Sequence, residues 1–197
     1  MRSDQQQNNE RLIQAAAALF ERSEGSISLA DIAKEANVSV ATAYRHFDSV
    51  DDALHAYRRD IGIRFAEFSF EQKSSGLVLL EAVNGFWVEL VLDKGAALVH
   101  RRSAEGFLSR YTQREEYMVG QIDALERPLR EITELLGLES VPGIHDEAAF
   151  LWNILFDPRE IFDLRTTVGL NSVQISRRLT GAFRGALSGW AAAKTSE

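Results

Sequence analysis

The chain contains no cysteine, and only three of its 197 residues are proline. Without cysteine it has no disulfide, no thiolate metal ligand and no cysteine nucleophile, a composition that fits the cytosol. The scarcity of proline leaves long stretches that helices can occupy without interruption. Apolar residues recur at spacings of three and four nearly throughout, and no convincing alternating run is present. We therefore predict an all-α protein of nine or ten helices.

Long hydrophobic runs are also absent. The longest, Leu77–Leu92, has 16 residues and includes Glu81 and Glu89, so it is too short and too charged to span a bilayer. The first eleven residues are polar and lack the apolar centre of a signal peptide. We expect a cytoplasmic protein that does not enter a membrane.

Positive charge is in the minority, with 22 Lys and Arg against 29 Asp and Glu and a net charge of −7. This balance disfavours a protein that coats nucleic acid through bulk charge, although it permits one small DNA-reading face. Enzyme motifs are missing: there is no H-E-x-x-H, no G-x-S-x-G and no glycine-rich phosphate loop, and the four histidines lie far apart. We expect no catalytic residue, no metal and no cofactor.

The pattern of residues 28–47 is the most informative in the chain. Ser28 and Asp31 have the spacing of a capping box at the start of one short helix, and Ser39 can cap a second. Asn37 stands between them, where the chain must turn. Two short helices joined this closely are typical of a helix-turn-helix, in which the second helix lies in the major groove of DNA.

The second of these helices carries the predicted DNA-facing side chains. No acidic residue occurs between positions 36 and 47. The hydroxyls of Thr42 and Tyr44 can donate to phosphate oxygens, and small apolar groups can contact thymine methyls. The predicted DNA-binding residues are Ser39, Val40, Ala41, Thr42, Tyr44, Arg45 and His46.

Residues Arg11–Leu54 resemble the DNA-binding domain of the tetracycline-repressor (TetR) family. The resemblance is carried by the run RLIQAAAALF, by Gly25, by SLADIAKEANVSVATAYRHF with its specific ending YRHF, and by Ala53-Leu54. It implies a one-component transcriptional regulator, usually a repressor and a homodimer that binds a palindromic operator in double-stranded DNA. It also implies a DNA-binding domain at 1–57 and a ligand-binding and dimerisation domain at 58–197.

The resemblance further implies a division of roles within the second short helix. Thr42, Tyr44 and His46 would contact the DNA backbone, while Ser39, Val40, Ala41 and Arg45 would set the sequence preference. The chain departs from the family at Asn37, where glycine is frequent, and at Ala43, where leucine is frequent. It also has Val50, flanked by Asp48, Asp51 and Asp52, where the family often has lysine beside a phosphate.

Two alternative interpretations remain at the level of sequence. In the first, the helix-turn-helix region makes protein contacts only, which the acids at positions 48, 51 and 52 favour. In the second, the chain binds a small molecule and no DNA. A measurement of binding to duplex DNA distinguishes a regulator from both alternatives, since neither of them binds DNA.

A binding site for a small, mostly apolar effector is expected between the helices that follow residue 60. Aromatic side chains at helical spacing can line a cavity, and a few polar groups can orient a ligand within it. Core packing is the more frequent role of such aromatic residues. The candidate ligand-binding residues are Phe65, Phe68, Asn84, Trp87, His100 and Phe107.

A homodimer interface is expected on the last long helices. Gly181, Gly185 and Gly189 recur every four residues and form a bare ridge on one helix face, along which a second backbone can approach closely. The alternative is that this face packs within one subunit. The remaining candidate interface residues are Phe150, Leu151, Ile154, Phe183 and Leu187.

Overall fold

The computed structural model describes residues 4–22, 26–99 and 105–194. Within these ranges the chain forms ten α-helices, two short 3-10 helices and no strand, which confirms the all-α prediction. The helices are α1 Asp4–Arg22, α2 Leu29–Glu35, α3 Val40–His46, α4 Val50–Glu71, α5 Gly76–Lys94, α6 Phe107–Thr112, α7 Val119–Leu135, α8 Ile144–Leu155, α9 Pro158–Thr166 and α10 Ser172–Lys194, with 3-10 helices η1 Gly95–Val99 and η2 Glu116–Met118.

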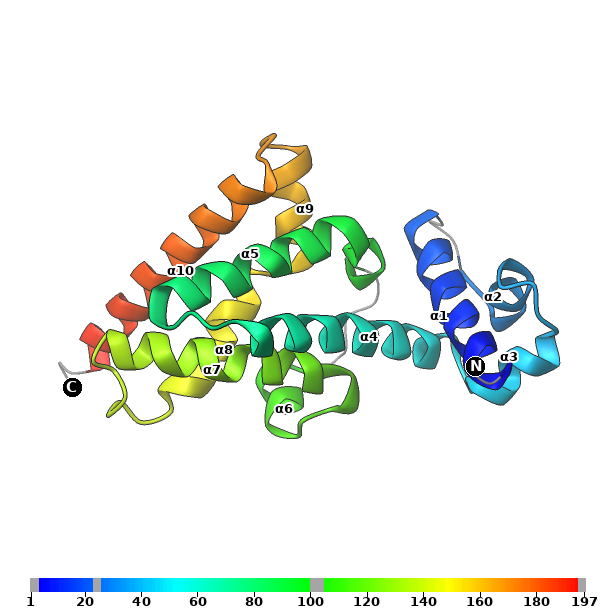
Figure 1. Cartoon of the computed structure of the whole chain (residues 1–197), viewed down its shortest axis with the longest axis horizontal. Helices are drawn as coiled ribbons and strands as arrows, with labels where there is room; N and C mark the ends of the chain where they lie inside the picture. The colour runs from blue at the N-terminus through cyan, green and yellow to red at the C-terminus, as the bar shows by residue number, and fades with distance from the viewer. Residues whose placement is uncertain (1–3, 23–25, 100–104, 195–197) are drawn as a thin grey trace.

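The molecule is elongated, with α1, α2 and α3 gathered in a small lobe at one end (Figure 1). Helix α4 leaves this lobe and runs into a bundle formed by α5 to α10 (Figure 1). The predicted domain boundary after residue 57 falls inside α4, which is continuous across it. One helix therefore belongs to both parts and connects them mechanically.

Polar caps begin several helices where the sequence predicts them. The Ser49 hydroxyl accepts from the backbone N–H of Asp52 at 3.1 Å, and the Asp52 carboxylate accepts from the N–H of Ser49 at 2.8 Å. Asn171 and Gln174 form the same reciprocal pair ahead of α10. Each pair satisfies N–H groups that have no partner inside the helix.

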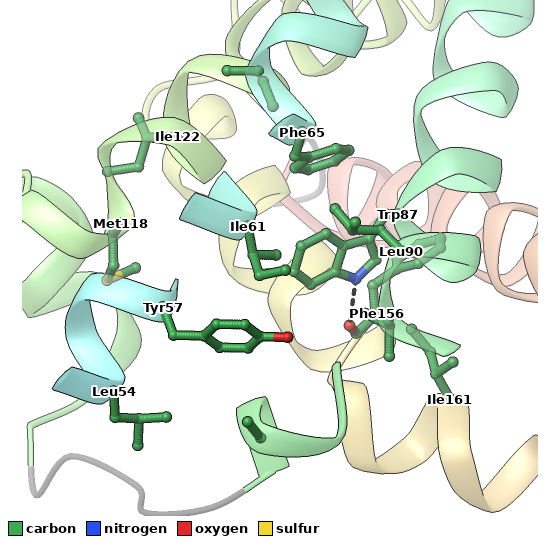
Figure 2. Close-up of a cluster of buried hydrophobic side chains, with 14 of the residues drawn as sticks. Leu54, Tyr57, Ile61, Phe65, Trp87, Leu90, Met118, Ile122, Phe156 and Ile161 are labelled. Atoms are coloured by element: carbon green, nitrogen blue, oxygen red, sulfur yellow. Dashed lines mark hydrogen bonds between the residues drawn. The ribbon is translucent and has the colours of Figure 1, made fainter. Parts of the chain in front are cut away.

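Helix α5 is buried on most sides, as its continuous apolar sequence predicts. It packs against α4, α7, α9 and α10. At its centre Trp87 lies 5.0 Å from Phe65 and 5.4 Å from Trp152, measured between ring centroids. Figure 2 shows Trp87 donating its indole N–H to the backbone carbonyl of Phe156, at 3.0 Å.

Helices α4 and α7 cross at two glycines. A Cβ atom placed on Gly120 would lie only 2.3 Å from the carbonyl carbon of Gly62, so the two backbones touch. Only glycine permits an approach this close. The crossing fixes α4 against the bundle, and the sequence analysis did not identify it.

Helix α7 contains Pro128 and continues through it without interruption. Proline has no N–H, so the carbonyl of Ala124, four residues earlier, loses its helical partner. The buried hydroxyl of Ser69 on α4 donates to that carbonyl at 2.7 Å. A side chain from a neighbouring helix thus replaces the missing backbone hydrogen bond.

The apolar spacing of the sequence predicts a first helix from residue 9, one helix over residues 95–111 and another from residue 113, and these three boundaries are wrong. The first helix begins at Asp4 rather than at residue 9. The helix predicted over residues 95–111 is replaced by η1 and α6, and residues 100–104 between them lie outside the described ranges. The helix predicted from residue 113 begins only at Val119, because Arg114 adopts a left-handed φ of 50° that no helix can continue through.

Candidate nucleic-acid interface and effector cavity

Small buried residues hold α2 and α3 together. Ala33 and Ala43 are fully buried, and Ala36 is nearly so, where the two helices approach each other. Phe47, immediately after α3, is also buried in the core of the lobe. The facing sides of α2 and α3 are therefore part of the core of the lobe.

The turn between α2 and α3 is a left-handed helix ending. Asn37, where the sequence predicts that the chain turns, has a φ of 54°. The N–H of Val38 donates to the carbonyl of Ala33 at 3.0 Å, and that of Asn37 donates to the carbonyl of Lys34 at 3.1 Å. This Schellman motif sets the angle at which α3 leaves α2. Arg11 of α1 donates to the Asn37 carbonyl and ties the turn to the rest of the lobe.

The outer face of α3 is exposed to solvent. The exposed fraction is 59% for Tyr44 and 45% for Val40, large values for an aromatic and a branched apolar side chain. Ser39, Ala41 and Arg45 are exposed, whereas Thr42 and His46 are half-buried. We refer to these seven residues as the α3 face. The structure thus brings all seven predicted DNA-binding residues onto one short helix and its cap.

Hydrogen bonds order part of the α3 face. Ser39 caps the helix by accepting from the N–H of Thr42 at 3.0 Å. The Ser39 and Thr42 hydroxyls lie 2.8 Å apart, and the Arg45 guanidinium donates to the Thr42 hydroxyl at 3.2 Å. Arg45 therefore lies back along its own helix and must exchange this hydrogen bond to reach a base.

Acidic side chains near the α3 face are engaged in local contacts. The Ser28 hydroxyl and backbone N–H both donate to Asp31, which holds the pKa of that carboxyl below its usual range. Glu35 pairs with Arg22 at 2.8 Å. Asp52 accepts from the N–H of Ser49. Three carboxylates on α2 and α4, the helices before and after α3, thus serve helix ends or an ion pair.

A cavity of about 970 Å³ lies between α4, α6, α8 and α9 and opens to solvent. Of the predicted ligand-binding residues, Trp87 and Phe107 line it. Phe65 is fully buried against Trp87 and Trp152, and Phe68 stacks on Phe86 at 4.0 Å. His100 lies outside the described residues.

Asn84 occupies the core rather than the lining of the cavity. Its amide donates to the Thr180 hydroxyl at 2.9 Å, and its carbonyl oxygen accepts from the indole N–H of Trp152 at 2.8 Å. The side chain is fully buried. Asn84 therefore joins α5, α8 and α10 through side-chain hydrogen bonds.

The candidate dimer residues lie on two faces of α8 and α10. A Cβ atom added at Gly181, Gly185 or Gly189 would meet nothing within 4 Å in the described part of the chain. Ile154 is 47% exposed, and Phe150 and Leu151 are half-buried. Phe183 and Leu187, in contrast, are fully buried in the core of their own subunit.

The α1–α3 lobe also meets the bundle at η1, and α4 is itself bonded to the end of α5. The 3-10 helix η1 packs against α1, while its residues Leu98 and Val99 line the cavity. The Tyr57 hydroxyl on α4 donates to the carbonyl of Lys94 at the end of α5. Burial, together with the charge of Glu21, raises the pKa of Tyr57 to about 12, so the hydroxyl keeps its proton.

The described residues hold no group of three or more His, Asp or Glu placed to bind a metal ion together. None of the described helices is long and apolar enough to cross a membrane.

Comparison with solved structures shows the same fold in transcriptional regulators. A tetR-family transcriptional regulator from Streptomyces coelicolor superimposes with a TM-score of 0.66 at 19% identity, covering 98% of this chain and 85% of that one. A proposed transcriptional regulator from Pseudomonas aeruginosa PAO1 gives 0.64 at 19% identity, covering 95% and 93%. No curated protein sequence matches the chain significantly.

The sequence of the N-terminal lobe matches a protein family directly. Residues 12–57 match the family described as "Bacterial regulatory proteins, tetR family". The matched segment contains the helix-turn-helix formed by α2 and α3, and it ends within α4. These residues thus form a helix-turn-helix DNA-binding domain of the tetR type, and the remainder of the chain shares its fold with the solved regulators above.

Proposed function

We propose that the protein is a dimeric transcriptional repressor that binds a palindromic operator with α3 and leaves it when a small molecule occupies the cavity. The observation that carries the proposal is the exposed α3 face on a tetR-type domain. A helix that presents Tyr44, Val40 and Arg45 to solvent without covering them is suited to entering a major groove.

The residues of the α3 face have different roles in this proposal. The Tyr44 hydroxyl and His46 contact phosphate oxygens and hold α3 in register, which gives affinity without sequence preference. Val40 and Ala41 contact base edges, and Arg45 reaches a guanine after leaving Thr42. Helix α3 carries Arg45 and no acidic residue, so it is locally positive although the chain as a whole has a net charge of −7.

Dimerisation places two α3 helices on one DNA duplex. The proposed interface consists of the bare ridge of Gly181, Gly185 and Gly189 together with the exposed Ile154 of α8. In a two-fold dimer this surface packs against the same surface of a second copy. Phe183 and Leu187 are not part of this proposed interface, because they pack inside their own subunit.

The effector acts through α4 and η1 in this proposal. Ile61 and Gly62 of α4 line the cavity, and the same helix begins at Val50, directly after α3. A ligand that prefers one orientation of α4 changes the separation of the two α3 helices. The ligand can lower the DNA affinity only as far as it binds one orientation of α4 more tightly than the other. By reciprocity, operator DNA lowers the ligand affinity by the same factor.

Fluorescence anisotropy with duplex DNA from beside the protein's own gene tests the proposal. The wild-type protein is expected to bind with a nanomolar Kd at moderate salt, at least 100-fold more tightly than it binds a scrambled duplex. Tyr44→Ala is expected to weaken binding to both duplexes, and Arg45→Ala to reduce the preference between them. Arg130→Ala, on the exposed surface of α7, serves as the matched control and is expected to change neither. Equal affinity for the two duplexes would contradict sequence-specific regulation.

A further inference from the structure

The α3 face holds an arginine on a threonine of its own helix. The guanidinium of Arg45 donates to the Thr42 hydroxyl at 3.2 Å, one turn back along α3. Arg45 is exposed and Thr42 is half-buried, so this hydrogen bond lies on the surface that the proposed function turns toward DNA. Helix α3 has no acidic residue that could replace Thr42 as the acceptor.

The Thr42 hydroxyl is itself held in place. It lies 2.8 Å from the Ser39 hydroxyl, and the oxygen of Ser39 is fixed because it accepts from the backbone N–H of Thr42 at 3.0 Å. Threonine is branched at Cβ, so a helix leaves it few side-chain rotamers. The hydroxyl is therefore an acceptor that is already in position for Arg45 before DNA arrives.

The hydrogen bond to Thr42 competes with a base for the same guanidinium. A guanine opposite Arg45 accepts from it only after the bond to Thr42 has broken, whereas at any other base Arg45 can stay on Thr42. The free energy of the bond to Thr42 is thus subtracted from the preference for guanine and leaves the binding of the other bases unchanged. The side chain at position 42 therefore sets how strongly one base pair is discriminated.

We propose that Thr42 is a specificity-determining residue that acts through Arg45. Its hydroxyl is the acceptor that Arg45 leaves when it reads a guanine, and it lowers the discrimination of that base pair. This inference rests on the reading of an operator by α3 in the proposed function. Thr42 is a positioning residue in this role and needs no contact with a base.

The resemblance of the sequence to a known family implies a different role for Thr42, a contact with the DNA backbone. Phosphates are the same at every base pair, so the loss of a phosphate contact weakens the binding of all duplexes by one factor. Loss of the acceptor for Arg45 strengthens binding only where Arg45 reaches its guanine. The ratio of two affinities therefore rises in the second case and stays constant in the first.

Binding measurements on four duplexes test the role of Thr42. Selection from random duplex DNA by the wild type and by Arg45→Ala identifies the base pair at which only the wild type has a preference. Fluorescence anisotropy then gives the Kd for four duplexes that differ at this base pair alone. Thr42→Val keeps the branched shape and removes the hydroxyl, and we expect it to raise the preference for the best duplex about two- to tenfold, the range of one net hydrogen bond. Thr42→Ser keeps the hydroxyl and is expected to retain the wild-type preference.

Two controls connect the effect to Arg45. In an Arg45→Ala background, Thr42→Val should leave the four affinities in an unchanged ratio, because no arginine remains to be released. Thr166→Val, on the exposed side of α9, removes a hydroxyl that donates to the carbonyl of Phe162 at 2.9 Å, and it should keep the wild-type preference. An unchanged or lower preference in Thr42→Val, the same rise in the Arg45→Ala background, or a rise in Thr166→Val would each overturn the role of Thr42.

NMR relaxation of the free wild-type protein tests the hydrogen bond even if Thr42→Val does not fold. The side-chain Nε of Arg45 is expected to be more ordered on the picosecond to nanosecond timescale than that of Arg130, whose guanidinium lies 3.8 Å from Glu134 on the exposed side of α7. Equal mobility of the two arginines would overturn the hold of Thr42 on Arg45.

The proposed function is judged separately by the selection itself. Enrichment of no site contradicts the proposed function and the role of Thr42 together. An enriched site at which Thr42→Val leaves every affinity ratio unchanged overturns the role of Thr42 alone, and the proposed function stands.

Discussion

At the scale of single residues, two buried polar side chains, Asn84 and Ser69, find their partners on other helices. The Asn84 side chain donates to the Thr180 hydroxyl and accepts from the Trp152 indole N–H. The Ser69 hydroxyl donates to the carbonyl of Ala124, which Pro128 leaves without a helical partner. A buried group left without a partner costs about 1–3 kcal/mol. Such contacts therefore fix one arrangement of helices whose apolar surfaces alone would permit others.

The contact between Ser69 and α7 can be measured by a double-mutant cycle. Ser69→Ala is expected to lower the free energy of unfolding by about 1–3 kcal/mol, because the Ala124 carbonyl loses its donor. In a Pro128→Ala background the new N–H at position 128 supplies that donor, so the same serine substitution should cost much less. Urea unfolding of the four variants gives the coupling. An equal cost in both backgrounds would show that Ser69 does not replace the missing backbone bond.

At the scale of elements, α4 decides how the two parts of the molecule move together. It carries the end of the tetR-type domain, lines the cavity, and touches the backbone of α7 at Gly62 and Gly120. Tyr57 joins its first half to the end of α5. In the proposed mechanism, a change in the tilt of α4 turns about the glycine crossing.

Substituting Gly120 tests this crossing. A methyl group there would lie 2.3 Å from the backbone of α4, and since a backbone cannot rotate away, Gly120→Ala is expected to destabilise the protein by about 3 kcal/mol or more. Gly85→Ala is the matched control: it is also inside a helix, but the nearest atom lies 3.8 Å away, so it should gain about 0.5–1 kcal/mol from helix propensity. Thermal unfolding compares them. A neutral Gly120→Ala would contradict the close contact.

The sequence predicts those features that depend on neighbouring residues. Ser28, Ser39 and Ser49 begin helices as predicted, because a cap and its partner lie within one turn. It does not predict the glycine crossing, since this crossing joins residues that only the tertiary fold brings together. Ser69 and Ala124 are 55 positions apart. For the same reason the helical spacing of Phe65 and Asn84 could not separate core residues from cavity residues.

At the scale of the whole molecule, the proposed regulator needs a second copy. The outer ridge of α10 is open, so a large side chain at Gly185 meets nothing inside the described protomer. Gly185→Arg is therefore expected to fold and to give a monomer near 22.0 kDa by light scattering at micromolar concentration, where the wild type gives a dimer. Glu126→Arg, on an exposed site of α7, is the control and should stay dimeric. A dimeric Gly185→Arg protein would move the interface elsewhere.

The most direct test of the account is selection of binding sites from random duplex DNA by the wild-type protein. We predict enrichment of an inverted repeat whose half-site centres are separated by about 34–36 Å or a multiple of it, because two α3 helices related by a two-fold axis read one face of the duplex. Tyr44→Ala should reduce the recovered DNA without changing the repeat. Enrichment of no site, or of a single site without two-fold symmetry, would contradict the central claim.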